Sequence, residues 1–321
     1  MSGLTLKGPY RVAVRQHRRA LWTVPAVMVA GLVVVIVLRS WAESLPSGRL
    51  GASTPNRGYE LLYYFMRYAG AGVLFMPLLV GAFVAGPMTA RELESGTWRL
   101  ALTQSTTPKG WLGSKVVVAA VMSLLGSAAI VGVYRLGWVR VSHTYQLHWA
   151  DRGTYEASGP VLAAYCLLGV ALGVLIGQLI RRTLVSMAFT GVLTGLVVLG
   201  FGALRWSLVP AVTRTMPLEG NLYDVMPGSA LMVKSGLLTS SGERLPRYAC
   251  FERTHDMSVC PPDMNVTSWY VEFHPASHHW PTQLIESSLV FALACVTLFV
   301  AFRLVGARRG CPPPTGTVYV G

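Results

Sequence analysis

The chain has 321 residues, of which 52% are hydrophobic and only 13% are charged, and its formal net charge at pH 7 is +13. This composition excludes an ordinary soluble domain of the same size and indicates a membrane protein. The pI of about 9.9 is also typical of nucleic-acid-binding proteins. Here, however, the positions of the basic residues follow from membrane topology, so no nucleic-acid partner is expected.

Residues 1–19 precede the first apolar segment and carry Arg11, Arg15, Arg18 and Arg19 at helical spacing. The spacing predicts an amphipathic interfacial helix on the cytoplasmic side. Simple positive anchoring of the first span is the alternative interpretation. The following apolar segment exceeds the usual length of a signal-peptide core and lacks a small-residue cleavage site, so we expect the chain to retain it.

Six apolar segments approach the roughly 20 residues that a bilayer-spanning helix needs. They cover about 20–38, 69–86, 116–136, 161–180, 184–204 and 284–302. The predicted fold is an all-α membrane protein of six transmembrane helices with an amphipathic N-terminal interfacial helix and an external loop subdomain. The predicted units are an interfacial helix at 1–19, helices one to five within 20–204, an external subdomain at 205–283, helix six at 284–302 and a cytoplasmic tail at 303–321. Pro77 predicts a kink in the second span.

The distribution of charge predicts the orientation. With the N-terminus inside, the segments assigned to the cytoplasm hold 14 basic and two acidic residues, a net charge of +12. Cytoplasmic loops carry the excess of Lys and Arg, so both termini are expected in the cytoplasm. The two acidic residues, Glu92 and Glu94, are the positions that topology explains least, and we expect them to have a binding partner.

Residues 87–115 join the second and third spans and are dense in charges and helix caps. Arg91, Glu92 and Glu94 fall within about one helical turn, Gly96 is suited to end a helix, and Thr97 can cap the next one. Thr107 before Pro108 predicts another helix start. The loop is therefore expected to be folded. Local pairing of the acidic residues with Arg91 or Arg99 is the alternative to a partner outside the chain.

Spans four and five are separated by only three residues, which predicts a tight hairpin. Glycines recur every four residues in both spans, a pattern that lets helix backbones approach closely. They are Gly169, Gly173 and Gly177 in span four and Gly191 and Gly195 in span five. Chance spacing in a Gly-rich chain is the alternative. No span has a charge at its centre, which argues against an ion-driven pump.

The segment 205–283 is broken by prolines and read as an external loop subdomain. Cys250 and Cys260 would lie on the oxidising side, where a disulfide can form, although spacing alone leaves the pairing open. His274, His278 and His279 are a weak hint of zinc or copper binding. They lack a paired Cys or carboxylate set, so no metal is expected and an interfacial loop is the alternative.

Catalytic motifs were not found. A phosphate-binding Gly-x-x-x-x-Gly-Lys-[Ser/Thr] loop is lacking, because the similar stretch at 110–115 has the wrong spacing. No nucleophile elbow or paired-carboxylate arrangement occurs either. We therefore expect no catalytic residue, no cofactor and no ATP hydrolysis by this chain.

Three blocks give the chain a resemblance to the permease subunits of type-2 ABC exporters, particularly the six-span form of actinobacteria. The first, in 86–105, resembles the Ala-Arg-Glu-x-Glu-x-Gly-Thr loop of that family. The others are Gly-Gln-Leu-Ile-Arg-Arg-Thr at 177–183 and His-Pro-Ala-Ser-His-His-Trp-Pro-Thr-Gln-Leu-Ile-Glu at 274–286. His278 and His279 depart from the family pattern, in which an Arg and an aromatic residue are more usual, so no outer-gate role is assigned to them.

The resemblance implies a bacterial plasma-membrane protein that works with a separate ABC ATPase subunit at its cytoplasmic face, a second permease chain and membrane lipid. ATP would be bound by the ATPase, and export of a hydrophobic or amphiphilic substrate would follow alternating access. The residues that match the ATPase-coupling region of the family are Arg91, Glu92, Glu94, Gly96 and Thr97. Two other functions remain open: a non-transporting signalling or scaffold subunit that binds an ATPase, and an outward-facing metalloenzyme or metal carrier that uses the histidines around His274.

Overall fold

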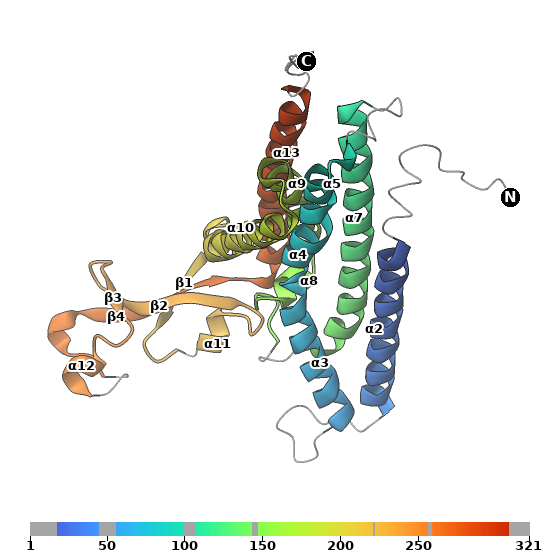
Figure 1. Cartoon of the computed structure of the whole chain (residues 1–321). Helices are drawn as coiled ribbons and strands as arrows, with labels where there is room; N and C mark the ends of the chain where they lie inside the picture. The colour runs from blue at the N-terminus through green and yellow to red at the C-terminus, as the bar shows by residue number, and fades with distance from the viewer. Residues whose placement is uncertain are drawn as a thin grey trace, which may run out of the picture.

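The computed structural model describes residues 18–44, 56–98, 107–142, 147–220, 222–255 and 259–307. Long helices form a bundle, and an antiparallel sheet projects from one end of it (Figure 1). We call this the sheet end, and the other the α5 end. Residues 1–17 of the predicted interfacial helix, including Arg11 and Arg15, lie outside the described residues, as does most of the C-terminal tail. Arg18 and Arg19, the last two residues of that prediction, form the start of α2 (Arg18–Ser44).

Five described helices are long and apolar enough to cross a membrane, judged by length and composition. They are α2 (Arg18–Ser44), α7 (Pro108–Val141), α9 (Val161–Ile180), α10 (Thr183–Leu204) and α13 (His279–Ala307). A sixth span results if the bent segment between α2 and α7 is counted as one. The chain is thus a mostly helical, multi-pass membrane protein.

The bent segment breaks at Leu74 and Phe75. It consists of α3 (Arg57–Val73), α4 (Met76–Leu79), the π-helix η1 (Val80–Ala85) and α5 (Gly86–Glu94), and the bend at the break is 40°. Pro77 lies in the first turn of α4, where its missing N–H breaks no helical hydrogen bond. The predicted kink near Pro77 is present, and it falls just before the proline.

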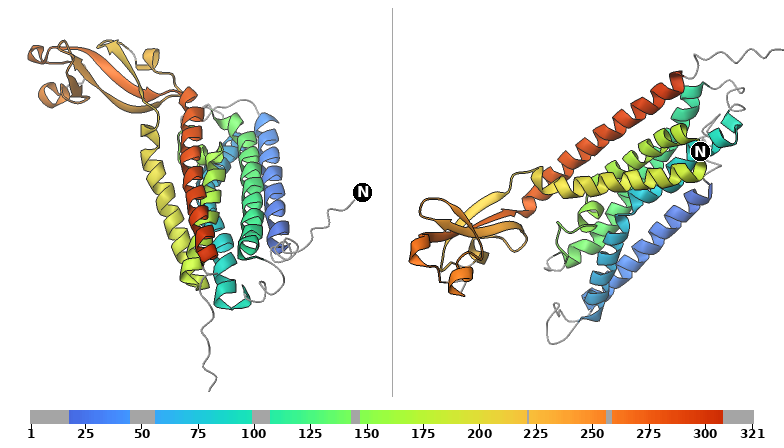
Figure 2. Two further views of the ribbon diagram at one scale, coloured as in Figure 1. Left: turned by 90° about the horizontal axis from the view of Figure 1, so that it is seen from above. Right: turned by 60° about the vertical axis from the view of Figure 1, so that its left-hand side comes forward.

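Helix α9 forms the centre of the bundle. In its most apolar stretch 67% of the residues are buried within the chain, against 11% for α2. It packs against α13, α10, α7 and the α4–η1–α5 segment. Figure 2 shows the helices gathered around this axis.

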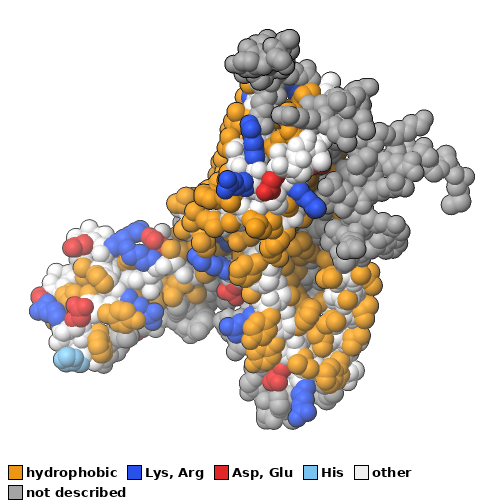
Figure 3. Space-filling view, in the orientation of Figure 1, with side chains coloured by type: hydrophobic (Ala, Val, Ile, Leu, Met, Phe, Trp, Pro, Cys, Tyr) orange, Lys and Arg blue, Asp and Glu red, His pale blue; other side chains and the backbone are white. Residues whose placement is uncertain are grey.

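Apolar side chains cover much of the outer surface of the bundle, whereas charged side chains cluster on the sheet and at the α5 end (Figure 3). Large exposed residues include Phe83, Leu125, Phe189, Val192 and Phe299. An apolar outer surface is what lipid-facing helices require, because hydrocarbon offers their side chains no hydrogen bonds.

The segment predicted as an external loop is folded into a four-stranded sheet. The strands β1 (Val212–Pro217), β2 (Leu231–Thr239), β3 (Arg244–Pro246) and β4 (Val266–His274) are antiparallel, in the order β1-β4-β2-β3. Strand β4 is rich in β-branched and aromatic residues, which favour a pleated, half-buried surface. Pro217 and Pro246 are the last residues of β1 and β3, so these prolines mark strand ends instead of breaking the chain into loops.

Close packing on β2 requires a glycine at its centre. Gly236 pairs with Tyr270 of β4 and with Pro246 of β3. A Cβ at this position would overlap the carbonyl oxygen of Leu245 and the ring of Tyr270. The short elements between the long ones are α8 (Thr154–Ala157), η2 (Arg205–Ser207), α11 (Leu222–Val225), α12 (Phe251–Thr254), η3 (Pro262–Met264) and η4 (Ala276–His278).

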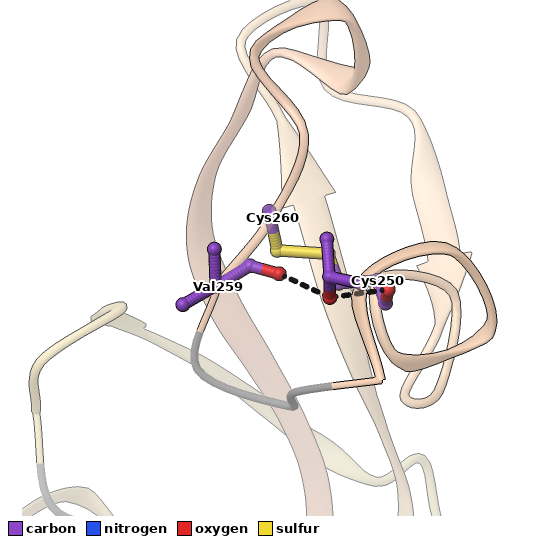
Figure 4. Close-up of a disulfide and its surroundings, with 4 residues drawn as sticks. Cys250, Val259 and Cys260 are labelled. Carbon is purple, nitrogen blue, oxygen red and sulfur yellow. Dashed lines mark hydrogen bonds between the residues drawn. A yellow bond between two sulfur atoms is a disulfide. The ribbon is translucent and has the colours of Figure 1, made fainter.

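A disulfide joins Cys250 and Cys260 at the far end of the sheet subdomain (Figure 4). The Thr254 hydroxyl lies within the loop that it closes, 2.8 Å from each of the carbonyl oxygens of Cys250 and Val259. These contacts connect α12 to residues 259–261, which lead to η3.

Candidate functional site

The α5 end contains the residues that the sequence marks for coupling. Helix α5 ends at Glu94, and Gly96 follows with a positive φ of 72°, which a glycine adopts without strain. Helix α7 begins at Pro108, and the Thr107 Oγ1 accepts a hydrogen bond of 3.0 Å from the N–H of Gly110. Both helix boundaries therefore have the caps predicted from the sequence. Residues 99–106, including Arg99, lie outside the described range.

Glu92 joins α5 to α7. One carboxylate oxygen forms an ion pair with the Lys115 ammonium, and the other accepts a 2.9 Å hydrogen bond from Trp111 Nε1. The Lys115 Nζ also donates to the Met88 carbonyl oxygen at 3.1 Å and lies 4.9 Å from the centre of the Trp111 ring. Since Lys115 is buried, this carboxylate supplies the counter-charge that the ammonium needs.

Glu94 joins α5 to α10. Its Oε2 accepts hydrogen bonds from the N–H of Thr183 at 2.9 Å and from the Thr183 hydroxyl at 2.5 Å. Thr183 is the first residue of α10, and a carboxylate is stabilised at a helix N-terminus by the unpaired N–H groups. The Ser186 hydroxyl adds a 3.2 Å bond to the carbonyl oxygen of Gly86.

These contacts correct the sequence interpretation of the two acidic residues. Both already have partners within the chain, at Lys115 and Thr183, so they do not by themselves require a partner outside it. Among the described residues, neither carboxylate pairs with Arg91, which was the alternative interpretation. Arg91 is instead exposed, and so are Lys109 in the first turn of α7 and Arg181 and Arg182 between α9 and α10. Figure 3 shows basic and acidic side chains exposed at the end of the bundle that bears α5.

The glycines of α9 lie against the broken second span. A Cβ at Gly169 would lie 2.7 Å from the Pro77 carbonyl oxygen, and one at Gly173 would lie 2.5 Å from the Ala85 Cβ. A Cβ at Gly177 would overlap the Thr89 hydroxyl. The glycines of α10 pack less closely against the second span. A Cβ at Gly191 would lie 3.4 Å from the Ala82 side chain, and one at Gly195 would lie 3.2 Å from the Leu78 side chain. The α9 glycines therefore let α4, η1 and α5 touch the central helix.

A second cluster, at the sheet end, was missed by the sequence analysis. Arg205 was assigned to the start of the external loop, but only 2% of it is exposed. Its Nε donates to Glu286 Oε2 at 2.8 Å, and its Nη2 donates to Glu156 Oε1 at 2.6 Å and to Glu286 Oε1 at 3.0 Å. The guanidinium carbon lies 3.7 Å from the centre of the Tyr155 ring. This buried ionic cluster joins α8, η2 at the end of α10, and α13.

Neutral donors complete the buried ionic cluster. The Tyr165 hydroxyl of α9 donates to Glu286 at 2.6 Å, and the Gly153 N–H donates to Glu156 at 2.6 Å. The sequence held one usable signal, because Glu286 falls inside the predicted sixth apolar segment and Arg205 directly follows the fifth. Charges at such places must find partners, but the identity of the partner depends on the fold.

The three histidines near the sheet do not converge on one point. His274 Nδ1 lies 3.1 Å from His278 Nδ1, while the ring of His279 lies near the Ser158 hydroxyl at 3.4 Å. Burial, and then the neighbouring His278, lower the pKa of His274. No group of three or more His, Cys, Asp or Glu residues suited to a metal occurs among the described residues.

The fold and its apolar surface define a multi-pass helical membrane protein. At the α5 end, Glu92 and Glu94 bond α5 to α7 and α10. Residues 55–205, from just before α3 to the end of α10, match the family described as ABC-2 membrane transporter related. The match supports an ABC-2 type permease, and permeases of that family in general work with an ABC ATPase. No curated protein and no solved structure matches the chain. The matched range is shorter than the resemblance seen in the sequence, which also included 274–286.

Proposed function

We propose that this chain is the membrane-spanning permease subunit of an ATP-driven exporter. A separate ATPase subunit docks at the α5 end, which faces the cytoplasm, and the sheet lies outside the bacterial plasma membrane. ATP is bound and hydrolysed by the ATPase, so this chain needs no cofactor or catalytic residue. A second permease chain completes the transporter, which moves a hydrophobic or amphiphilic substrate by alternating access.

One observation carries the proposal beyond the family. Within the matched range, the end of α5 is bonded to two other spans through two acidic residues, Glu92 to α7 and Glu94 to α10. A displacement of α5 by a docked subunit therefore acts on three spans together. The close contact with the α9 glycines gives α5 a smooth surface against which to shift, because no side chain of α9 projects at those positions.

The docking test uses Arg91, because both acidic residues hold internal bonds and their reversal would disturb the fold. The charge-reversing Arg91→Glu variant is expected to lose most of the ATPase that copurifies with the wild-type chain from native membrane. The matched control is Arg214→Glu, at an exposed arginine in β1 at the opposite end. Equal ATPase recovery from the two variants would contradict docking at this surface.

The coupling test uses Glu94→Gln. The variant keeps an oxygen that can accept from Thr183 but loses the charge at the start of α10. We expect the ATPase to stay bound while its stimulation by substrate in reconstituted vesicles falls severalfold, since the neutral amide loses the attraction between the carboxylate and the N-terminus of α10. ATPase binding without any substrate-dependent stimulation, in the wild type as well, would indicate a signalling or scaffold subunit instead of a transporter.

A further inference from the structure

Two hollows follow one face of the broken second span. The hollow nearer the sheet end has a volume of about 620 Å³ and is lined on α3 by Tyr63, Arg67 and Ala71. The other has a volume of about 200 Å³ and is lined by Leu74, Phe75 and Leu78. Tyr63, Arg67, Ala71 and Leu74 are three or four residues apart and follow one face of α3, and Phe75 and Leu78 continue from them across the break into α4. The hollows are therefore consecutive along the span.

The same residue, Arg152, lines both hollows. It lies in the turn before α8, and with Arg67 it makes the first hollow basic. The second hollow is apolar, because α10 closes it opposite α4 with Gly195, Val198, Leu199 and Gly202. The two hollows together form a track along the second span, and its lining changes from basic to apolar at Arg152. Figure 3 shows charged side chains in the recess between the sheet and the apolar surface of the bundle.

The acidic residues of the track are already engaged. Asp151 accepts the N–H of His148 at 2.7 Å, and both oxygens of Glu156 are bonded, one to Arg205 and one to Gly153. Arg67 and Arg152 are exposed and have no ion-pair partner among the described residues. The lining of the first hollow therefore holds two guanidinium groups against the one carboxylate of Asp151, a net charge of +1, and both guanidinium groups are open to a ligand.

Aromatic residues place the arginines at the level of lipid headgroups. Tyr64 and Tyr68 flank Arg67 on α3 and are 48% and 70% exposed on the bundle surface. Exposed tyrosines of membrane helices concentrate at the boundary between headgroups and hydrocarbon. The apolar hollow continues from there toward the middle of the span.

We propose that the two hollows form one binding site for an anionic phospholipid of the leaflet at the sheet end. The phosphate lies between Arg67 and Arg152, where guanidinium groups make charge-assisted hydrogen bonds to its oxygens. One acyl chain occupies the apolar hollow between α4 and α10, against the break at Leu74 and Phe75. This site goes beyond the proposed transport function, because it requires neither the ATPase nor a transported substrate.

The headgroup test measures lipids retained by the full chain after purification from vesicles containing equal amounts of phosphatidylglycerol and phosphatidylcholine. The wild type is expected to retain phosphatidylglycerol preferentially. Arg67→Gln and Arg152→Gln should each reduce that preference about tenfold, as expected for losing one charge-assisted hydrogen bond. Arg214→Gln, with the same loss of charge on the sheet, should keep it.

The acyl-chain test fills the apolar hollow. Gly202→Trp places a ring in the hollow, and the structure has open space for its Cβ. We expect it to reduce retention of both lipids. Gly200→Trp is the matched control, because this glycine of the same helix also has open space but does not line the hollow. A monodisperse size-exclusion profile shows that each variant is folded.

Three results would overturn the proposal. They are equal retention of the two lipids by the wild type, an unchanged preference in both arginine variants, and equal effects of the two tryptophan variants. A fourth arm adds glycerol 1-phosphate, a headgroup without acyl chains, at millimolar concentration. Displacement of the lipid by this anion would show a free-phosphate site, whereas resistance to it supports the lipid. The assay contains no ATPase, so failure of the transport proposal would leave its outcome unaffected.

Discussion

Replacing Arg205 by methionine tests the buried ionic cluster most directly. Methionine fills a similar volume, but the variant leaves two carboxylates, of which the side chains are 5% and 0% exposed, without their cation. Removing one partner of a buried ion pair costs about 3–5 kcal/mol. We expect the upper part of that range, because Arg205 bonds to both Glu156 and Glu286 and its loss also leaves the two acids facing each other.

The assay is unfolding in mixed micelles with increasing SDS, followed by tryptophan fluorescence. Trp206 neighbours the cluster, with its ring centre 6.0 Å from that of Tyr155, and reports its opening. Arg244→Met is the control, since the Arg244 to Glu272 ion pair on the sheet is half-exposed and should contribute at most about 1 kcal/mol. The triple variant Arg205→Met, Glu156→Gln, Glu286→Gln should recover much of the lost stability, because it leaves no buried charge unpaired. Unfolding of Arg205→Met at the same SDS fraction as the control would refute the reasoning.

Three further changes test other parts of the structure. Gly173→Leu should destabilise the bundle by about 1–3 kcal/mol through overpacking, whereas Gly132→Leu, with open space at its Cβ, should not; equal SDS unfolding of the two would contradict the close contact. Replacing both Cys250 and Cys260 by serine should cost the sheet subdomain about 2–3 kcal/mol, seen as faster limited proteolysis, and the wild type should bind no maleimide there until it is reduced. Burial lowers the pKa of His274 below its ordinary value of 6.5, so the unfolded state takes up a proton more readily and the subdomain should lose stability as the pH falls below about 6.5. Proteolysis at pH 5 and 7.5 measures this effect, and a wild type cleaved no faster at pH 5 than at pH 7.5 would rule it out.

The apolar segments could be placed from the sequence because bilayer thickness acts on a continuous stretch of chain. Residues 161–180 and 184–204 agree closely with α9 and α10. Local rules also located the kink near Pro77 and the caps at Gly96 and Thr107. Each of these features depends on residues within a few positions of one another.

The bonds that define the two clusters connect residues far apart in the chain, and no local rule predicts them. Glu92 binds Lys115, 23 positions later, and Arg205 binds Glu286, 81 positions later. The positions of Arg205 and Glu286 at the ends of apolar segments indicate that each charge needs a partner of opposite sign. The choice of partner depended on which helices meet around α9, and that is a property of the fold.

The sheet was missed because its prolines were weighed more heavily than its strand-forming residues. Strand β4 contains Val, Thr, Trp, Tyr and Phe within nine residues, a composition that favours a strand. Its partners β1 and β2 lie on either side of it in the sheet, although β3 is the strand that directly precedes it in the chain. Pairing of this kind gives no periodic signal of its own.

The position of Glu286 constrains the order in which the protein can be assembled. Glu156 and Arg205 precede the sheet in the chain, so they can pair as soon as α10 has entered the membrane. Glu286 lies in α13, the last described helix, and it joins them only after the whole sheet segment has been synthesised. A nascent chain that stops before α13 therefore holds Arg205 with one carboxylate instead of two, and without the hydrogen bond from Tyr165 that completes the cluster. When α13 packs against α9, it therefore also supplies the final charge of the buried ionic cluster.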